Sequence, residues 1–243
     1  MKIALIGYGV MGRQIEQICR SRGHEVVFIL GKERLEGWEE HLSKAEVAIE
    51  FTEPAVAVKN LFDCFRLGVP VVCGTTGWYG QLNEVSNSCL HAQGALFYAS
   101  NFSIGVNLFF RLNLQLAALM ESHAEYEARL EETHHTRKKD APSGTAITLA
   151  EGLIESNKHY HSWTLGDTTE AGRLPVQAIR KDDVPGTHRI EWRSPNDSIS
   201  ISHEAFNRKG FATGAVIAAE FLHGKKGVFS MNDLFNTTAY HGL

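Results

Sequence analysis

Short apolar runs that alternate with helix-length segments fill the first hundred residues, and this alternation constrains the fold more than any other feature of the chain. Strands are predicted where Val, Ile, Leu and Phe cluster, at residues 2–6, 25–30, 46–51, 69–73 and 95–99. Helices are expected after the first run and over 54–67 and 78–92, whereas the link between the second and third runs holds no convincing full helix. Strands that alternate with helices form a parallel sheet with helices on both faces, so we expect an α/β, doubly wound fold for residues 1–103.

The pattern changes after about residue 103, which indicates a second domain. Apolar residues at helical spacing predict a long amphipathic helix, marked by Ile104, Leu108, Leu112, Leu116 and Leu119. Further strands are expected at 125–133, 175–181, 187–193 and 198–204, with a helix from 143 to about 156. These elements predict an α+β domain with a mixed or antiparallel sheet over residues 104–210. An apolar helix at 212–223 could return to pack on the first domain, which residues 211–243 would then complete.

Composition and charge argue against two classes of protein. The 243 residues carry a formal net charge of −4, whereas a nucleic-acid-binding protein usually shows a basic excess. The chain has no run of 18 or more apolar residues, so no membrane span is expected. The four cysteines (Cys19, Cys64, Cys73 and Cys89) lack CxxC spacing and are interpreted as buried free thiols in a reducing compartment. We therefore expect a cytoplasmic protein with a small-molecule ligand and no nucleic-acid or membrane partner.

A glycine-rich turn after the first predicted strand points to a dinucleotide. Residues Gly7, Tyr8, Gly9, Val10, Met11 and Gly12 match GxGxxG between a predicted strand and a predicted helix, which is the context that the motif requires. The first glycine permits the tight turn, the second admits a pyrophosphate close to the backbone, and the third allows close helix–strand packing. A tight turn with no ligand would use the same residues. The context favours a Rossmann-type, dinucleotide-binding domain.

The end of the second predicted strand bears on which dinucleotide is used. A NAD-binding domain usually has Asp or Glu there to hold the ribose 2′-hydroxyl, but this chain has Leu30-Gly31-Lys32. Lys32 could contact the 2′-phosphate of NADPH, or it could be an ordinary solvated lysine. We expect NADPH to be accepted at least as well as NADH, and a clear preference for NADH in kcat/KM would contradict this. Phe51-Thr52, Gly74-Thr75-Thr76-Gly77 and Asn101-Phe102 end later strands, where a cofactor would lie.

A run in the middle of the chain combines proton-transfer groups with the start of a helix. It contains His134, His135 and Lys138, and then Ser143, Gly144 and Thr145 at the predicted helix start. Histidine is the natural acid or base at neutral pH, and the free N–H groups after an N-cap serine can bind a carboxylate. A charged surface loop before a capped helix is the alternative interpretation. A metal site fits poorly, because the two histidines are adjacent and no further ligand pattern is evident.

The run from Glu132 to Ala146, which is E-T-H-H-T-R-K-K-D-A-P-S-G-T-A, resembles the signature of the 4-hydroxy-tetrahydrodipicolinate reductases (dihydrodipicolinate reductases) of lysine and diaminopimelate biosynthesis. The resemblance spans essentially the whole chain. It includes the glycine turn, Phe51-Thr52, Gly74–Gly77, Asn101–Asn107 and Phe211–Ala215. The His-His…Lys…Asp-Ala-Pro-Ser-Gly-Thr run is its most specific part.

The resemblance implies roles for individual residues. His134 would be the proton donor or acceptor, Lys138 the proton donor that completes reduction, and His135, Gly144 and Thr145 the ligands of a substrate dicarboxylate. NADPH or NADH would be held by Gly7, Tyr8, Gly9, Val10, Met11, Gly12, Gly74, Thr75, Thr76, Ala99, Ser100, Asn101 and Phe102. A Rossmann domain closed by the C-terminal segment would accompany an inserted domain for substrate binding and oligomerisation, and members typically pair through the inserted sheet as homotetramers.

The expected activity is NAD(P)H-dependent reduction of 4-hydroxy-tetrahydrodipicolinate to tetrahydrodipicolinate with loss of water. The chain departs from the family pattern in its short link between the second and third strands, the missing acidic residue after the second strand, and Ser100, where Ala or Pro is frequent. A related NAD(P)-dependent imine or amino-acid reductase is one alternative. A non-catalytic dinucleotide sensor is another, although binding alone does not require the proton donors of the His-His…Lys set.

Overall fold

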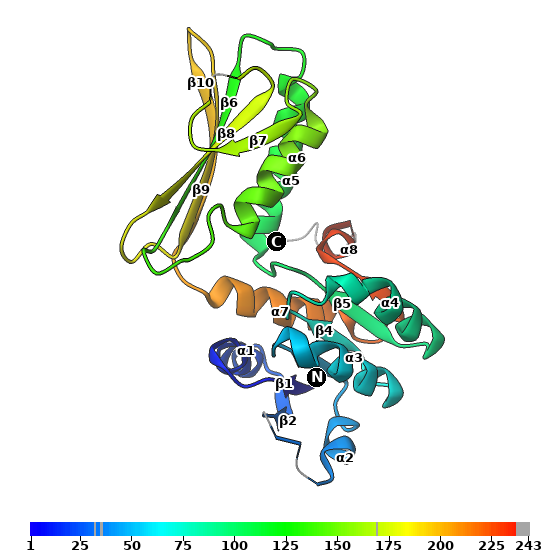
Figure 1. Ribbon diagram of the computed structural model, residues 1–243. Helices are drawn as coiled ribbons and strands as arrows, with labels where there is room; N and C mark the ends of the chain where they lie inside the picture. Colours follow the sequence, from blue (N-terminus) through cyan, green and yellow to red (C-terminus); the bar gives the residue numbers. More distant parts are fainter. Residues whose placement is uncertain (32, 35, 169, 237–243) are drawn as a thin grey trace. The chain divides into compact units, whose positions relative to one another are not determined.

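The computed structural model describes residues 1–31, 33–34, 36–168 and 170–236. The chain divides into two compact units, Met1–Ser103 with Lys209–Leu243 and Ile104–Arg208 (Figure 1). The second division falls at Lys209 rather than at residue 211, because the helix that returns the chain to the first unit already begins at Lys209. Among the described residues, no helix combines the length and apolar character needed to cross a membrane.

The first unit contains a parallel, six-stranded sheet with the order β11-β5-β4-β3-β1-β2. Its strands are β1 (Lys2–Ile6), β2 (Glu25–Leu30), β3 (Val47–Glu50), β4 (Val71–Cys73), β5 (Ala95–Tyr98) and β11 (Gly227–Phe229). The order reverses at β1, as in a doubly wound fold, so the predicted Rossmann-type architecture is confirmed. The three-residue strand β11 was not predicted and extends the sheet by pairing with β5.

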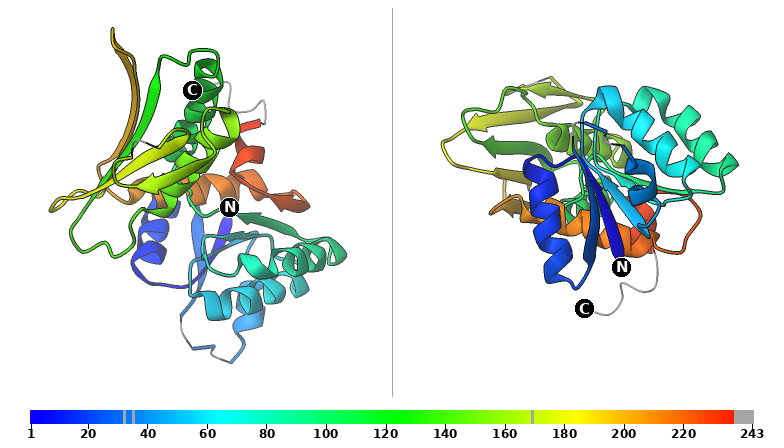
Figure 2. Two further views of the ribbon diagram at one scale, coloured as in Figure 1. Left: turned by 45° about the horizontal axis from the view of Figure 1, so that its top comes forward. Right: turned by 90° about the horizontal axis from the view of Figure 1, so that it is seen from below.

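Helices cover both faces of this sheet, which explains why its strands are apolar throughout. The helices α1 (Val10–Ser21) and α7 (Lys209–Leu222) contact each other on one face, and α3 (Pro54–Arg66) and α4 (Leu82–His91) lie on the other (Figure 2). Shorter elements are α2 (Trp38–Leu42), a 3₁₀ turn (Tyr79–Gln81) and α8 (Met231–Asn236). The four cysteines are free and buried, as expected from their apolar surroundings.

The second unit is a mixed, five-stranded sheet with two helices packed on it. The order is β10-β9-β6-β8-β7, formed by β6 (Glu127–His134), β7 (Ser162–Leu165), β8 (Arg173–Arg180), β9 (Gly186–Arg193) and β10 (Ser198–Ala205). Strand β8 is parallel to β6 and β7, whereas β9 is antiparallel to β6 and β10, so a mixed sheet is correct. The helices α5 (Ile104–Met120) and α6 (Gly144–Ser156) contact each other and the sheet (Figure 1).

The predicted long helix is confirmed as α5, but three of the leucines that mark it do not lie on its buried face. Leu108, Leu112 and Leu119 are exposed, with 69% of Leu119 accessible. The buried face instead carries Val106, Phe109, Asn113, Ala117 and Met120. The helices α5 and α6 pack closely, since Asn113 donates to the carbonyl oxygen of Leu149 at 2.8 Å and a Cβ on Gly152 would lie 2.9 Å from Leu114. The helix is apolar on several faces, so leucine spacing alone did not identify the packed one.

Candidate active site

The glycines of the turn between β1 and α1 each meet a different structural demand. Gly7 has a φ of +94°, and a Cβ there would lie 2.1 Å from the carbonyl oxygen of Phe51. A Cβ on Gly12 would lie 2.3 Å from the carbonyl oxygen of Gly7. In contrast, a Cβ on Gly9 would meet no described atom within 4 Å. The fold itself therefore requires the first and third glycines, whereas the second faces open space.

That open space lies where a dinucleotide pyrophosphate is held in Rossmann domains. Gly9 is the N-cap of α1, and within the described part of the chain it makes no side-chain cap, so the first N–H groups of the helix remain available to an anion. Beside it, the Thr52 N–H donates to Thr75 Oγ1 at 2.7 Å, which ties together the loops after β3 and β4. A Cβ on Gly74 would lie 2.0 Å from the Phe51 ring. The loops are thus closely packed around a cradle that fits a dinucleotide.

The other predicted cofactor residues differ in accessibility. Val10, Thr76 and Ser100 are exposed, Met11, Gly74 and Asn101 are half-buried, and Thr75, Ala99 and Phe102 are buried. Tyr8 is at the surface and donates its hydroxyl hydrogen to Glu16. Phe102 packs on Phe51 and Phe97, so any contact of Phe102 with a cofactor would involve its backbone. Lys32 lies outside the described residues.

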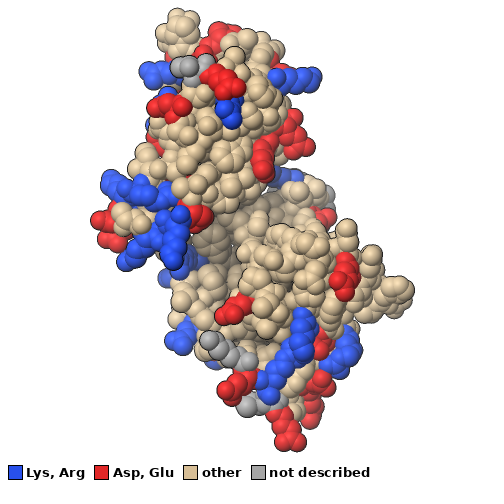
Figure 3. Space-filling model, in the orientation of Figure 1, with Lys and Arg blue, Asp and Glu red and all other residues tan. Residues whose placement is uncertain are grey.

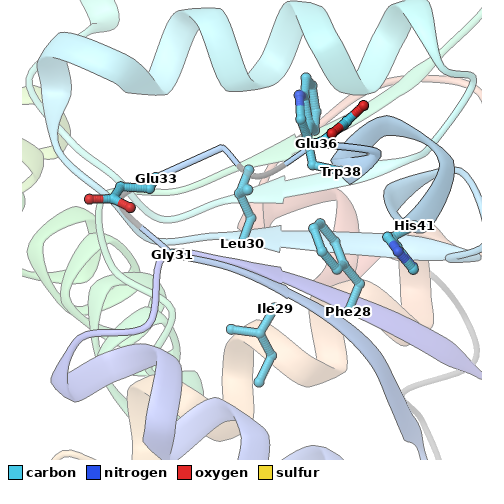
Figure 4. A pocket seen from close by; sticks show the side chains of 8 residues that line it. All are labelled: Phe28, Ile29, Leu30, Gly31, Glu33, Glu36, Trp38 and His41. Atoms are coloured by element: carbon cyan, nitrogen blue, oxygen red, sulfur yellow. The ribbon is translucent and has the colours of Figure 1, made fainter.

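A cavity of about 540 Å³ lies along β2 and α2 (Figure 4). Its lining is formed by Phe28, Ile29, Leu30, Gly31, Glu33, Glu36, Trp38 and His41. The rings of Phe28 and His41 stack in it, with centroids 5.6 Å apart. The neighbouring Arg34 is engaged elsewhere, since its guanidinium binds Asp63 and Asn60 and stacks over Trp38. The described part of the lining thus includes two carboxylates, Glu33 and Glu36, and no Lys or Arg.

In the second unit, the inward face of the sheet changes from apolar to polar along its strands. Side chains alternate between faces in a strand, so Ala128, Leu130, Glu132 and His134 of β6 all point toward the helices. On the neighbouring strands the same face runs through Val176 to Arg180 on β8 and through Ile190 to His188 on β9. Glu132, His134, His188 and Arg180 therefore meet where α6 begins.

Glu132 is the centre of this cluster and is completely buried, with 0% of its surface accessible. Both of its carboxylate oxygens accept from the Ser143 N–H at 3.1 Å, and Oε1 lies 3.4 Å from the Arg180 guanidinium. Burial alone would raise the pKa of Glu132, but the His188 ring and the Ser143 hydroxyl and N–H outweigh it and lower the pKa to about 2. Glu132 is therefore ionised throughout the physiological range.

His134 packs against this carboxylate and is itself buried. Its Nδ1 lies 3.4 Å from Oε2 of Glu132, and its ring meets that of His188 edge-on at 5.1 Å. Burial lowers the pKa of His134 to about 4, and the positive charges of Lys138 and Arg180 act in the same direction, while Glu132 opposes them. At neutral pH His134 is a neutral imidazole.

The loop after β6 carries Lys138 and leads into α6. Lys138 Nζ donates to both oxygens of Asp140, at 2.7 and 2.8 Å. Ser143 is the N-cap of α6, as predicted, and its hydroxyl accepts from the Ala146 N–H at 3.2 Å. Gly144, which is exposed, and Thr145, which is half-buried, form the first turn of α6, and His135 is half-buried in the loop. Figure 3 shows Lys and Arg side chains gathered at the end of the sheet from which this loop emerges.

Glu132, His134 and His188 are also residue types that bind metals. Their ligand atoms lie within 4.8 Å of one another. However, the Glu132 carboxylate already accepts two contacts from the Ser143 N–H, and the cationic Arg180 lies beside it. A divalent cation would have to displace the Ser143 N–H from the carboxylate and lie close to the positive charge of Arg180. These three residues are therefore better suited to hydrogen bonding than to metal binding.

Sequence reasoning did not identify the parts played by Glu132, Arg180 and His188. The alternation of apolar and polar residues in β6 could have predicted that Glu132 is buried, because it places this carboxylate on the same face as Ala128 and Leu130. Arg180 and His188 lie on strands that pair with β6 from about 50 residues further along the chain. Their proximity to Glu132 depends on strand order and register, which a single sequence does not reveal.

Acid should destabilise the chain through these two groups. In the unfolded chain, His134 takes up a proton below the ordinary histidine pKa of 6.5, whereas in the folded chain it is protonated only below about pH 4. The free energy of unfolding therefore falls as the pH drops from 6.5 to about 4. Between pH 4.5 and about 2, Glu132 adds to the loss, because only the unfolded carboxyl is protonated there. Urea unfolding should show a loss on the order of 1 to 2 kcal/mol from His134 between pH 7 and pH 5.

The variant His134→Gln removes the titrating ring, so its free energy of unfolding should change less between pH 7 and pH 5 than that of the wild type. The matched control is His91→Gln, which alters an exposed histidine. Equal slopes for the wild type and His134→Gln would contradict the assignment of this acid sensitivity to His134.

Comparisons with known proteins agree over nearly the whole chain. Residues 1–102 match the model of the dihydrodipicolinate reductase N-terminus, and residues 105–235 match that of the dihydrodipicolinate reductase C-terminus. A 4-hydroxy-tetrahydrodipicolinate reductase from Christiangramia forsetii is 44% identical over 97% of this chain and 98% of its own length. One from Alkaliphilus oremlandii is 36% identical over 80% of this chain and 81% of its own.

A solved structure supports the same fold. The dipicolinate-bound dihydrodipicolinate reductase from Paenisporosarcina sp. TG-14 superposes with a TM-score of 0.76 at 20% identity, covering 95% of this chain and 97% of that one. The sequence matches and the shared architecture lead to one conclusion: the chain belongs to the dihydrodipicolinate reductase family.

Proposed function

We propose that this chain reduces 4-hydroxy-tetrahydrodipicolinate to tetrahydrodipicolinate with loss of water, using NADPH or NADH. The observation that carries the proposal is the grouping of Lys138, His134 and the start of α6 at one end of the second sheet. This grouping offers a proton donor beside N–H groups that suit a carboxylate. Membership of the reductase family and the open dinucleotide cradle of the first unit provide independent support.

The substrate is a cyclic dicarboxylate, and the basic end of the second sheet suits its charge. His135, Gly144 and Thr145 are the proposed ligands of a carboxylate, because the first N–H groups of α6 lie at the positive end of the helix dipole. The relative that superposes on this chain is dipicolinate-bound, which supports a dicarboxylate of the same size and charge. The exposed cations of the loop, Arg137 and Lys139, would help to attract such a ligand.

The 4-hydroxyl leaves as water together with a proton from C5, which places a C4=C5 double bond in conjugation with the ring imine. When bound, the reduced nicotinamide would supply the hydride that adds to C4, and the resulting enamine must take up a proton at C5. Lys138 is the proposed proton source, since Asp140 holds its ammonium group on a loop anchored beside the helix start. His134 is neutral at pH 7, so it carries no extra proton to donate but can accept or relay one.

The second unit also provides a surface for assembly. Strand β10 is a sheet edge, and five of its residues, Ser198, Ile199, Ser200, Ser202 and Glu204, are exposed. We propose that this sheet pairs with other copies of the chain to form a homotetramer, which sedimentation velocity would test through the mass of the particle. The four free, buried cysteines support a reducing, cytoplasmic location.

The choice between NADPH and NADH stays a prediction. NADPH was expected to serve at least as well as NADH because of Lys32, which lies outside the described residues. The described surroundings contribute Glu33 and Glu36 to the cavity along β2, and carboxylates there would oppose a 2′-phosphate. Initial rates with each cofactor, compared as kcat/KM, decide the order, and a clear preference for NADH would contradict the expectation.

Replacement of Lys138 should remove the proton source. We expect Lys138→Ala to lower kcat by about 100-fold or more, the usual scale for the loss of a positioned acid. The measurement follows cofactor absorbance while the substrate is made in situ from pyruvate and aspartate semialdehyde. Lys139→Ala is the matched control: Lys139 is exposed on the same loop, and loss of its long-range attraction should change the substrate KM while kcat stays near that of the wild type. Near-normal kcat in Lys138→Ala would contradict the assigned role.

Substitution of Gly9 should weaken cofactor binding while the fold persists. A methyl group on Gly9 would enter the space assigned to the pyrophosphate, so we expect Gly9→Ala to raise the KM for the cofactor about tenfold or more, equivalent to about 1.4 kcal/mol. Gly80→Ala is the control, because a Cβ there also meets no described atom within 4 Å. An unchanged cofactor KM in Gly9→Ala would show that the pyrophosphate is held elsewhere.

A further inference from the structure

We propose that Glu132 is a positioning residue: its buried carboxylate, together with Arg180, holds the loop 135–142 that carries Lys138, and it orients the His134 ring. The inference rests on the proposed function, because the positions of Lys138 and His134 matter to catalysis only if these residues act on a substrate. Both Glu132 and Arg180 exert their effect through neighbouring groups.

The location of Glu132 gives the first argument. It occupies an inward position of β6 that continues a row of apolar residues, Ala128 and Leu130, and none of its surface is accessible. A buried carboxylate is costly to desolvate unless charge and hydrogen bonds compensate it, and well-packed apolar residues can often replace a buried ion pair as a whole without loss of stability. Folding alone therefore gives little reason for a charge at this position, whereas a need to organise polar neighbours does.

The contacts of the carboxylate supply the second argument. Glu132 accepts from the Ser143 N–H at 3.1 Å, which fixes the start of α6 directly after the loop. Arg180 lies beside Glu132 at 3.4 Å and donates to the carbonyl oxygen of Asp140 at 2.6 Å. The loop that leaves β6 at His134 is thus anchored again at Asp140 and at Ser143. Lys138 lies between these anchors, and its Nζ donates to Asp140.

The third argument concerns the orientation of the His134 ring. Nδ1 of His134 is buried and makes no hydrogen bond among the described residues, and Oε2 of Glu132 lies 3.4 Å away. A carboxylate at this distance favours the tautomer with its proton on Nδ1 and leaves Nε2 as the basic nitrogen. On its other side the ring abuts Gly186, where a Cβ would lie 3.0 Å from Nε2. The ring is therefore confined between Glu132 and a residue without a side chain.

The test combines Glu132→Gln with a control on the same strand. Glutamine keeps an acceptor for the Ser143 N–H but removes the charge that pairs with Arg180 and favours one His134 tautomer. We expect kcat to fall about 10- to 100-fold, the scale for a small misplacement of reacting groups, with the KM for the cofactor unchanged. Long-range ¹⁵N NMR should show His134 as the Nδ1–H tautomer in the wild type and as a mixture in the variant. Glu131→Gln, on the opposite face of β6, should change neither property.

A second variant covers the case in which Glu132→Gln does not fold. Arg180 is partly exposed, and Arg180→Lys keeps the charge but cannot bridge the carboxylate and the Asp140 carbonyl together. It should lower kcat and speed amide hydrogen exchange across residues 135–142, with the cofactor KM unchanged. Wild-type kcat, tautomer and exchange in either variant would overturn the proposal.

The two hypotheses fail in different ways. If the wild-type chain does not turn over the dicarboxylate, the proposed function is wrong. Loop exchange and the His134 tautomer remain measurable in that case, because neither depends on substrate. If the wild type turns over the dicarboxylate but either folded variant, Glu132→Gln or Arg180→Lys, behaves like it, the positioning role alone is wrong.

Discussion

A single buried charge, the carboxylate of Glu132, determines how the second unit is arranged around its reactive groups. An ion without access to water must be neutralised by its surroundings, and the partners of Glu132 come from three separate segments. Ser143 begins α6, Arg180 ends β8, and His188 lies on β9. One carboxylate at the end of β6 is therefore compensated by the start of α6 and by the two strands that pair with β6. Lys138 and His134 take their positions from this arrangement.

In the first unit, the main constraint is that the backbone must come close to a large anion, the pyrophosphate of the proposed dinucleotide. Gly7 and Gly12 are needed for packing, because a Cβ on either would overlap a carbonyl oxygen. Gly9 is packed against nothing in the described chain and leaves the start of α1 open. The contrast among three glycines of one motif separates the part that folding requires from the part that a ligand requires. The proposed cofactor-binding turn and the proposed proton donor, Lys138, thus lie in separate units of one chain.

Much of the fold could be predicted from the sequence, because buried parallel strands consist of short apolar runs and the glycine turn marks the first strand–helix connection. Short elements escaped prediction: β7 and β11 have three or four residues, too few for a periodic signal. The helix α5 was predicted but its packed face was not evident from leucine spacing, since Leu112 lies outside and Asn113 inside. In the site, the run from His134 to Thr145 could be identified because its members are close in sequence. Arg180 and His188 could not, because only strand pairing brings them to Glu132.

The central claim is that this chain transfers a hydride from nicotinamide to C4 of a cyclic dicarboxylate. The most direct test supplies cofactor carrying two deuterium atoms at the nicotinamide C4, generates the substrate in situ, and locates the label in the product by NMR. The account predicts one deuterium at C4 of tetrahydrodipicolinate for each cofactor oxidised. Oxidation that leaves C4 unlabelled, or no oxidation with the cofactor still bound, would contradict it.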